Sequence, residues 1–192
     1  QREWLEDLVN GIPSFKSSHC PQTWKKWIET GIYSPLQAKA EFIVRSTENQ
    51  LPSNKEEENI LKILLTEFSD RDFEFAAKEI IHFINPNFRN LSVTAKTQDG
   101  GRDVIGKYFI GHDQHEIILD AIAEAKFYNP YSKTKSSVGV SEMKRLISRL
   151  KENDIGVFIT TSFFGTQVQE ELHKDKRPIL LISGGDIARI LI

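Results

Sequence analysis

Two residues of the segment AIAEAKFY, Glu124 and Lys126, have the types and spacing to do chemistry. The segment follows Ile117, Ile118 and Leu119, so we expect it to continue a strand that is buried on both faces. Ionised side chains are rarely buried without partners, because the loss of their water is costly. A Glu-x-Lys pair at the end of such a strand therefore indicates a functional site.

Asp103 is the residue that we expect to join this pair. It follows the turn Asp99-Gly100-Gly101, and the next hairpin loop centres near Asp113-Gln114. Pairing of residues whose numbers sum to about 227 would place Asp103 opposite Glu124, with Cβ atoms roughly 5 Å apart. Glu124 and Lys126 share a face because side chains alternate along a strand. The three side chains should converge at one end of the hairpin.

The carboxylates of Asp103 and Glu124 would repel each other unless a cation lies between them. Oxygen ligands with open coordination positions suit Mg²⁺, or Mn²⁺ as its substitute, rather than zinc. Lys126 could hold or help deprotonate a water, or neutralise charge on a phosphate under attack. The alternative is an exposed Glu-Lys pair on an edge strand, with Asp103 merely following a turn.

The composition is that of an ordinary globular chain. Its 192 residues are 39% hydrophobic and 27% charged, with a formal net charge of −2. A nucleic-acid partner would therefore require a local basic patch. The single cysteine, Cys20, excludes an intrachain disulfide, and no apolar run is long enough to span a bilayer. We expect a cytoplasmic protein with no membrane partner.

Hydrophobic periods predict an α/β fold. Helices are expected over 2–9, 22–29, 35–47, 54–68, 70–84, 141–151, 166–174 and 185–192, and strands over 91–98, 104–110, 116–126, 155–162 and 178–183. Thr166 and Gln169 are expected to form a capping box. This order predicts a mixed central β-sheet flanked by helices. We expect residues 1–52 to form a small N-terminal helical region and residues 53–192 to form the main domain.

The segments around these residues resemble a known family. QDGGRDVIG followed by AEAK is similar to the PD-(D/E)xK nuclease superfamily, with Asp103 as the motif aspartate and Glu124-Ala125-Lys126 as the (D/E)xK half. VGVSEMKRLISRLKENDIGVFITTSFFGTQVQEEL and PILLISGGDIARIL resemble the Mrr-type restriction endonuclease branch, and DFEFAAKEI resembles its opening helix. The resemblance covers residues 70–192 and implies a restriction-endonuclease-like αβββαβ core.

Two departures from that branch matter. Many of its members have Gln where this chain has Glu124. Its modification-dependent members also carry a separate DNA-recognition domain, and no motif of such a domain is found here.

The resemblance also implies roles for individual residues. Asp103 and Glu124 would bind the divalent metal, the backbone carbonyl of Ala125 would add a ligand, and Lys126 would assist the hydrolytic water. A helix glutamate often completes such a site. Glu74 matches it, and Glu79 is a rival on a different face of the same helix.

Positive charge is concentrated between residues 126 and 151, where seven basic residues accompany one acidic residue. Such a run can hold DNA phosphates electrostatically. The residues expected to contact double-stranded DNA are Lys133, Lys135, Lys144, Arg145 and Arg149. The alternative is a solvated helix face beside a charged loop. Thr160 and Ser162 could contact phosphate or could be polar strand-end residues.

We therefore expect a Mg²⁺-dependent DNA endonuclease of restriction type. Phosphate contacts carry no direct sequence information, and residues 1–52 contain no helix-turn-helix or zinc signature. We expect a cleavage subunit that cuts one strand and depends on a larger recognition subunit, with the tryptophan-rich N-terminal region docking on that partner. Alternatives are a self-sufficient homodimer, a structure-specific repair or recombination nuclease, and a non-catalytic DNA-binding scaffold on the same fold.

Overall fold

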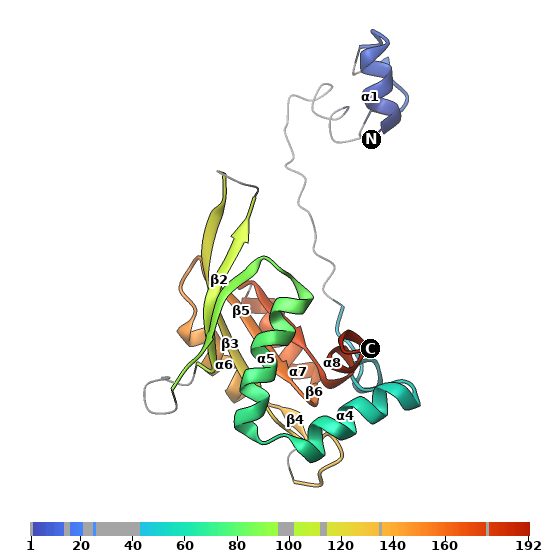
Figure 1. Ribbon diagram of the computed structural model, residues 1–192. Coiled ribbons are helices and arrows are strands. Elements are labelled where there is room, and N and C mark those ends of the chain that lie inside the picture. Colours follow the sequence, from blue (N-terminus) through green and yellow to red (C-terminus); the bar gives the residue numbers. More distant parts are fainter. Residues whose placement is uncertain are drawn as a thin grey trace. The chain divides into compact units, whose positions relative to one another are not determined.

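The computed structural model describes residues 2–13, 16–20, 25, 43–95, 102–111, 115–134, 136–175 and 177–192. The chain divides into two compact units, Gln1–Phe42 and Ile43–Ile192 (Figure 1). The helix predicted over 22–29 and the turn at 99–101 lie outside the described residues, apart from residue 25. No helix in the described part of the chain is long and apolar enough to cross a bilayer.

The first unit begins with helix α1, Arg2–Val9, which confirms the predicted helix over 2–9. Asp7 on this helix binds the segment that follows. It accepts a hydrogen bond from Ser17 Oγ at 2.5 Å and lies 3.1 Å from His19 Nδ1. The hydrogen bond from Ser17, followed by the contact with His19, lowers the pKa of Asp7. These contacts connect α1 to Ser17 and His19 within the first unit.

The second unit begins at residue 43. The helix predicted over 35–47 is wrong in its described part, because residues 43–46 are not helical and only the short helix α3, Thr47–Gln50, follows. Ser46 ends the non-helical stretch by capping α3. The side chain of Arg45 is bound to Asp186 at 2.7 Å, which fixes this segment on the second unit.

Two helices precede the sheet, as predicted. Helix α4, Lys55–Glu67, begins at Asn54, whose side chain accepts hydrogen bonds from two backbone amides of the first turn. Helix α5, Asp70–Ile84, opens with a capping box between Ser69 and Asp72. Local sequence signals therefore fix where both helices begin.

A five-stranded mixed sheet forms the centre of this unit, which confirms the predicted fold class. Its strands, in order across the sheet, are β1 (Phe88–Val93), β2 (Val104–Ile110), β3 (Ile117–Lys126), β5 (Ile155–Thr160) and β7 (Ile179–Ile182). The first three pair antiparallel, and β3, β5 and β7 pair parallel. Antiparallel and parallel halves thus meet at β3.

Strand β1 is the largest departure from the prediction over 91–98. It begins at Phe88, and residues 94 and 95 already lie outside it. A register shift between Arg89 and Ser92 interrupts its pairing with β2, and Asn90 has a φ of 55° there. This irregularity breaks the alternation on which the prediction depended. Two further strands, β4 (Ser137–Val138) and β6 (Phe163–Phe164), were not predicted, because two residues are too few to show a period.

Helices cover both faces of the sheet (Figure 1). On one face lie α4, α5 and α8 (Gly184–Ile190), and on the other lie α6 (Val140–Arg149) and α7 (Thr166–Asp175). The core on the α5 face includes Phe73, Ile80, Ala123, Ile159 and Ile187. The core on the α6 face includes Ile122, Met143, Leu146, Phe158 and Val168. Alternate residues of β3 therefore serve opposite cores.

The capping box predicted for Thr166 and Gln169 is wrong. The buried Gln169 side chain accepts a hydrogen bond from the backbone amide of Arg45 at 2.9 Å, and it donates to the carbonyl oxygens of Arg45 and Phe164, both at 3.0 Å. Gln50 is also buried and bonds Phe164 in both directions, at 3.0 and 2.9 Å. These amides join residues 43–50 to the body of the second unit, so long-range pairing determines their role.

Gly185, the second residue of helix α8, lies in a narrow space. Ser183 and Asp186 form the capping box that opens the helix. A Cβ added to Gly185 would lie 2.7 Å from the carbonyl oxygen of Leu51. Because the carbonyl groups of Leu51 and Gln50 that a Cβ would meet belong to the backbone, only glycine fits without a shift of the chain.

Replacement of Gly185 by alanine should therefore destabilise the second unit. Forcing a methyl group against backbone should lower the free energy of unfolding by about 1–3 kcal/mol, measured by urea denaturation. Gly165→Ala is the matched control, since a Cβ there meets nothing within 4 Å and should cost less than about 1 kcal/mol. Equal losses in the two variants would contradict the close approach at Gly185.

Candidate active site

The β2–β3 hairpin brings the predicted residues together. Its pairs run from Val104 with Ala123 to Ile110 with Ile117, so the predicted register, in which residue numbers sum to 227, is confirmed. Asp103 directly precedes β2, and its backbone amide donates to the Ala123 carbonyl at 3.0 Å. The Asp103 carboxylate accepts a hydrogen bond from the Ala125 amide at 2.7 Å. The carboxylate is thereby held against the end of β3.

Glu124 is the centre of the cluster. Its side chain is 0% exposed, and Lys126 Nζ lies 3.0 Å from Glu124 Oε1. Helix α6 adds two guanidinium groups, because Arg145 pairs with Oε1 and Arg149 lies 3.4 Å from Oε2. The hydrogen bond to Glu124 raises the pKa of Arg145. A buried carboxylate that pairs with three cations satisfies the requirement that buried charge be compensated.

The surroundings of Asp103 both raise and lower the pKa of its carboxyl group. Burial raises the pKa of the Asp103 carboxyl, and the negative charges of Glu124 and Glu74 act in the same direction. The Ala125 amide and the Lys126 ammonium, 3.7 Å away, act in the opposite direction, and the net pKa is raised. Glu74 thus acts on the site from α5.

The rival glutamate on α5 has a different neighbourhood. Glu79 is 59% exposed and pairs with Lys78 at 2.8 Å. It lines a separate pocket together with His82 and Arg89. Glu74, by contrast, is 17% exposed and pairs with Arg71. Glu74 is therefore the helix carboxylate that is placed to influence Asp103.

The donor set fits a hard divalent cation. The Lys126 ammonium lies among three oxygens, those of Glu124 at 3.0 Å, of Asp103 at 3.7 Å and of the Ala125 carbonyl at 3.1 Å. These oxygens already surround one positive charge. Among the described residues no group of three His, Cys, Asp or Glu side chains could hold a metal. Mg²⁺ needs only one or two carboxylates because it keeps several waters, so two carboxylates and a carbonyl suit it better than zinc.

The residues expected to contact DNA fall into two groups. Arg145 and Arg149 lie at Glu124, whereas Lys144 is 64% exposed and lies 3.9 Å from Glu171. Lys133 is exposed in the loop after β3, and Lys135 lies outside the described residues. Arg145 and Arg149 are therefore connected to the carboxylate of Glu124, and this connection was not predicted from the sequence.

The comparisons identify the family. The family model Mrr_cat, described as restriction endonuclease, matches residues 65–191. This match spans the hairpin, α5 and the cluster around Glu124. The chain belongs to the Mrr_cat restriction endonuclease family. The predicted PD-(D/E)xK resemblance is thereby confirmed.

Solved structures agree with this assignment. The chain is similar to the DNA modification-dependent restriction endonuclease AspBHI, with 32% identity and a TM-score of 0.70 over 99% of this chain and 48% of that chain. It is also similar to the MspJI restriction endonuclease, solved in complex with a 27-mer oligonucleotide, with 27% identity and a TM-score of 0.67 over 98% and 44% of the respective chains. The chain thus spans about half the length of these structures. No curated protein matches the sequence.

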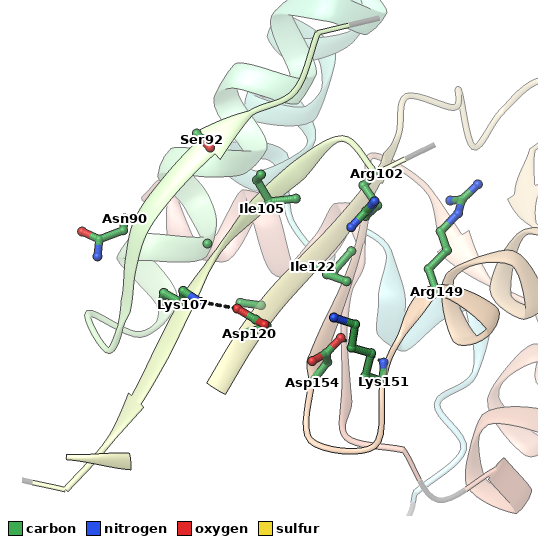
Figure 2. A pocket seen from close by; sticks show the side chains of 12 residues that line it. Asn90, Ser92, Arg102, Ile105, Lys107, Asp120, Ile122, Arg149, Lys151 and Asp154 are labelled. Atoms are coloured by element: carbon green, nitrogen blue, oxygen red, sulfur yellow. Dashed lines mark hydrogen bonds and ion pairs between the residues drawn. The ribbon is translucent and has the colours of Figure 1, made fainter. Parts of the chain in front are cut away.

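A groove of about 360 Å³ adjoins the carboxylate centre of this Mrr_cat domain (Figure 2). Ile122, two residues before Glu124 on the same face of β3, contributes to its lining. Figure 2 shows Lys107 and Asp120 paired across neighbouring strands, with the Arg149 side chain extending from the end of α6 at the side of the groove. The basic residues that line the groove are Arg102, Lys107, Arg149 and Lys151. They outnumber its acidic residues, Asp120 and Asp154.

Hydroxyl groups at the end of β5 support the Mrr_cat site from behind. Thr160 Oγ1 donates to the carbonyl oxygen of Lys126 at 2.7 Å, and Thr161 bonds the backbone of Tyr128 at 2.8 and 3.0 Å. Ser162 Oγ donates to the Ser136 carbonyl oxygen. All three hydroxyl residues are 0% exposed. The three hydroxyls bind backbone carbonyl oxygens, which agrees with the alternative that Thr160 and Ser162 are polar strand-end residues. Thr161 was not predicted from the sequence. Its signal was the polar run after a buried strand.

The role of Glu74 can be measured without cleavage. In Glu74→Gln the nearby negative charge is lost, so the pKa of Asp103 should fall. Carboxyl carbon NMR titration of metal-free protein would report the shift. Glu79→Gln, on the same helix, is the control and should leave the Asp103 titration unchanged. An unchanged Asp103 titration in Glu74→Gln would exclude Glu74 from the site.

Proposed function

We propose that this chain is a divalent-metal-dependent endodeoxyribonuclease that uses Mg²⁺, with Mn²⁺ as a substitute. The observation that carries the proposal is the Lys126 ammonium among the oxygens of Asp103, Glu124 and Ala125. Within a nuclease family, a preformed cation position made of two carboxylates and a carbonyl supports metal-assisted phosphodiester hydrolysis. Intact acidic and basic residues at this position argue against a non-catalytic scaffold.

Each residue has a proposed part in the reaction. Asp103, Glu124 and the Ala125 carbonyl would hold the ion. When bound, the ion supplies positive charge that activates water and stabilises the phosphate under attack. Lys126 would donate a hydrogen bond to the attacking water or to the phosphate from the same edge of the sheet. Glu74, through its charge, would keep Asp103 a strong ligand.

We also propose that cations beside this centre hold DNA through its phosphates. Arg145 and Arg149 lie at the catalytic carboxylate itself, and Lys144 lies on the same helix. Lys133 lies in the loop after β3, and Lys135, two residues later in the sequence, lies outside the described residues. Phosphate contacts from such a run would position the duplex without reading its sequence.

Metal binding and catalysis should separate by mutation. Asp103→Asn should lose both ion binding and cleavage, because it removes a ligand charge. Lys126→Ala should keep ion binding but lose cleavage by about 10²–10⁴-fold, the usual contribution of a positioned proton-transfer group. Ion binding is read by calorimetry and cleavage by gel, with Mg²⁺ and with EDTA. Lys174→Ala, an exposed cation on α7, is the control for loss of charge. Cutting at the wild-type rate by Lys126→Ala, or undiminished cutting in EDTA, would refute the assignment.

The second part of the proposal concerns target recognition. About half of AspBHI and more than half of MspJI have no counterpart in this chain, which covers 48% and 44% of them. We propose that base recognition is supplied by protein equivalent to that unmatched half, either in a recognition subunit beside this cleavage subunit or elsewhere in the same polypeptide. Modification dependence, which the name of AspBHI states for that protein, would then also reside there. A self-sufficient homodimer remains the competing arrangement.

The purified chain alone should therefore bind duplex DNA weakly, with an affinity that falls steeply with salt. With Mg²⁺ it should cut at no defined sequence, and it should treat modified and unmodified duplexes alike. Sequencing of the DNA ends gives both results. Addition of a recognition subunit should produce a cut in one strand at a fixed position. Efficient double-strand breaks at one short sequence by the chain alone would instead establish the homodimer.

A further inference from the structure

Three cationic side chains already pair with Glu124, the residue proposed to bind a metal ion. Arg145 and Lys126 lie at its Oε1 and Arg149 lies at its Oε2, so both carboxylate oxygens are engaged. The carboxylate is 0% exposed, so it cannot turn towards solvent to accept a further partner. An ion that binds Oε1 must displace Lys126 or Arg145, and an ion that binds Oε2 must share that oxygen with Arg149.

The charge of the cluster leads to the same conclusion. Asp103 and Glu124 supply two negative charges, while Lys126, Arg145 and Arg149 supply three positive ones. Three cations thus face these two carboxylates, although Glu142 adds a further negative charge that acts on Arg145. A divalent cation added to this cluster would meet repulsion from groups within a few ångströms, where the interaction is strong and weakly screened.

Both arginines are placed where they could bind a different anion. Arg145 is 47% exposed, so its guanidinium already reaches solvent at the edge of the site. Arg149 is 19% exposed and lines the basic groove beside Ile122 (Figure 2). A guanidinium forms paired hydrogen bonds with a phosphate as readily as with a carboxylate. A DNA strand that enters this groove therefore offers each arginine a new anionic partner.

We propose that Arg145 and Arg149 are exchangeable counter-ions of Glu124. Without DNA they neutralise the buried carboxylate and weaken its binding of the divalent ion. When DNA binds, they transfer to its phosphates, and Glu124 becomes available as a ligand. DNA and metal consequently bind cooperatively, and each raises the affinity for the other by the same factor. This inference rests on the proposed function, because it assumes that Glu124 is a ligand and that DNA is the substrate.

The first test measures ion binding without DNA. Calorimetric titration with Ca²⁺ or Mn²⁺ at pH 8 compares wild type with Arg145→Gln and Arg149→Gln. Each variant should bind the ion about tenfold more tightly, within the range of typical coupling between sites. Lys126 still neutralises Glu124 in both variants. Lys174→Gln, which removes a cation that is 71% exposed on α7, should bind the ion with the wild-type affinity. Wild-type or weaker ion affinity in both arginine variants would overturn the inference.

The second test measures the cooperativity itself. A saturating short duplex should raise the Ca²⁺ affinity of wild type about tenfold, and this gain should shrink in Arg149→Gln. A gel after the titration must show that the duplex is intact. An equal gain in wild type and Arg149→Gln would mean that DNA does not act through this arginine. If Arg149→Gln fails to fold by circular dichroism, the same comparison with Arg145→Gln, at the more exposed position, decides.

The two proposals can fail separately. A wild-type chain that cuts DNA with Mg²⁺, with arginine variants that keep the wild-type ion affinity, would leave the nuclease assignment standing and remove only the counter-ion exchange. A wild-type chain that binds no divalent ion, with or without DNA, would remove both.

Discussion

A carboxylate that is wholly buried at the end of a strand dictates the arrangement of this site. Glu124 has no exposure to solvent, and an unpaired charge in such a place would cost several kcal/mol. The fold meets this cost with cations from two elements. Strand β3 supplies Lys126 two residues later on the same face, and helix α6 supplies Arg145 and Arg149 one turn apart. The positions of the end of β3 and of helix α6 therefore depend on each other.

One crossover unit delivers these groups together. Strand β3 passes through a loop and α6 into the parallel strand β5, so α6 packs on the face of the sheet that carries Glu124. Thr160 and Thr161 at the end of β5 hold the backbone of Lys126 and Tyr128. The hydroxyl of Tyr128 donates to Glu142 at 2.7 Å, which ties the loop to the first turn of α6. The reactive end of β3 is thus fixed from the next strand and from the helix that connects them.

The sequence was informative where the decisive interactions are local or periodic. The turn and loop signals around β2 and β3 were enough to predict the register that places Asp103 opposite Glu124, and the hydrophobic period predicted helices over 54–68 and 70–84 that correspond to α4 and α5. It was uninformative where a side chain serves a distant partner. Gln169 has the spacing of a helix cap but binds Arg45 and Phe164, and no local pattern reveals that.

The same limit explains what was missed at the site. Arg145 and Arg149 were expected to contact DNA, but their pairing with Glu124 was not predicted, because the sequence gives the period of α6 and not its rotation against β3. The choice between Glu74 and Glu79 had the same origin, since both fit the helical pattern of α5. Only the packed structure separates the glutamate that acts on Asp103 from the one that pairs with Lys78 at the surface.

The identity of residue 124 and the two arginines of α6 are best understood together. The resemblance noted from the sequence implies Gln at this position in many Mrr-type members, and a neutral amide needs no counter-ion. With Gln, one carboxylate and three cations would leave a larger positive excess than the two carboxylates and three cations found here. If the proposed ion binds here, glutamate would lower the repulsion that the ion meets, and the arginines would be needed as counter-ions while the ion is absent. The charge at residue 124 and the cations beside it form one electrostatic unit, in which a change of either alters the requirement for the other.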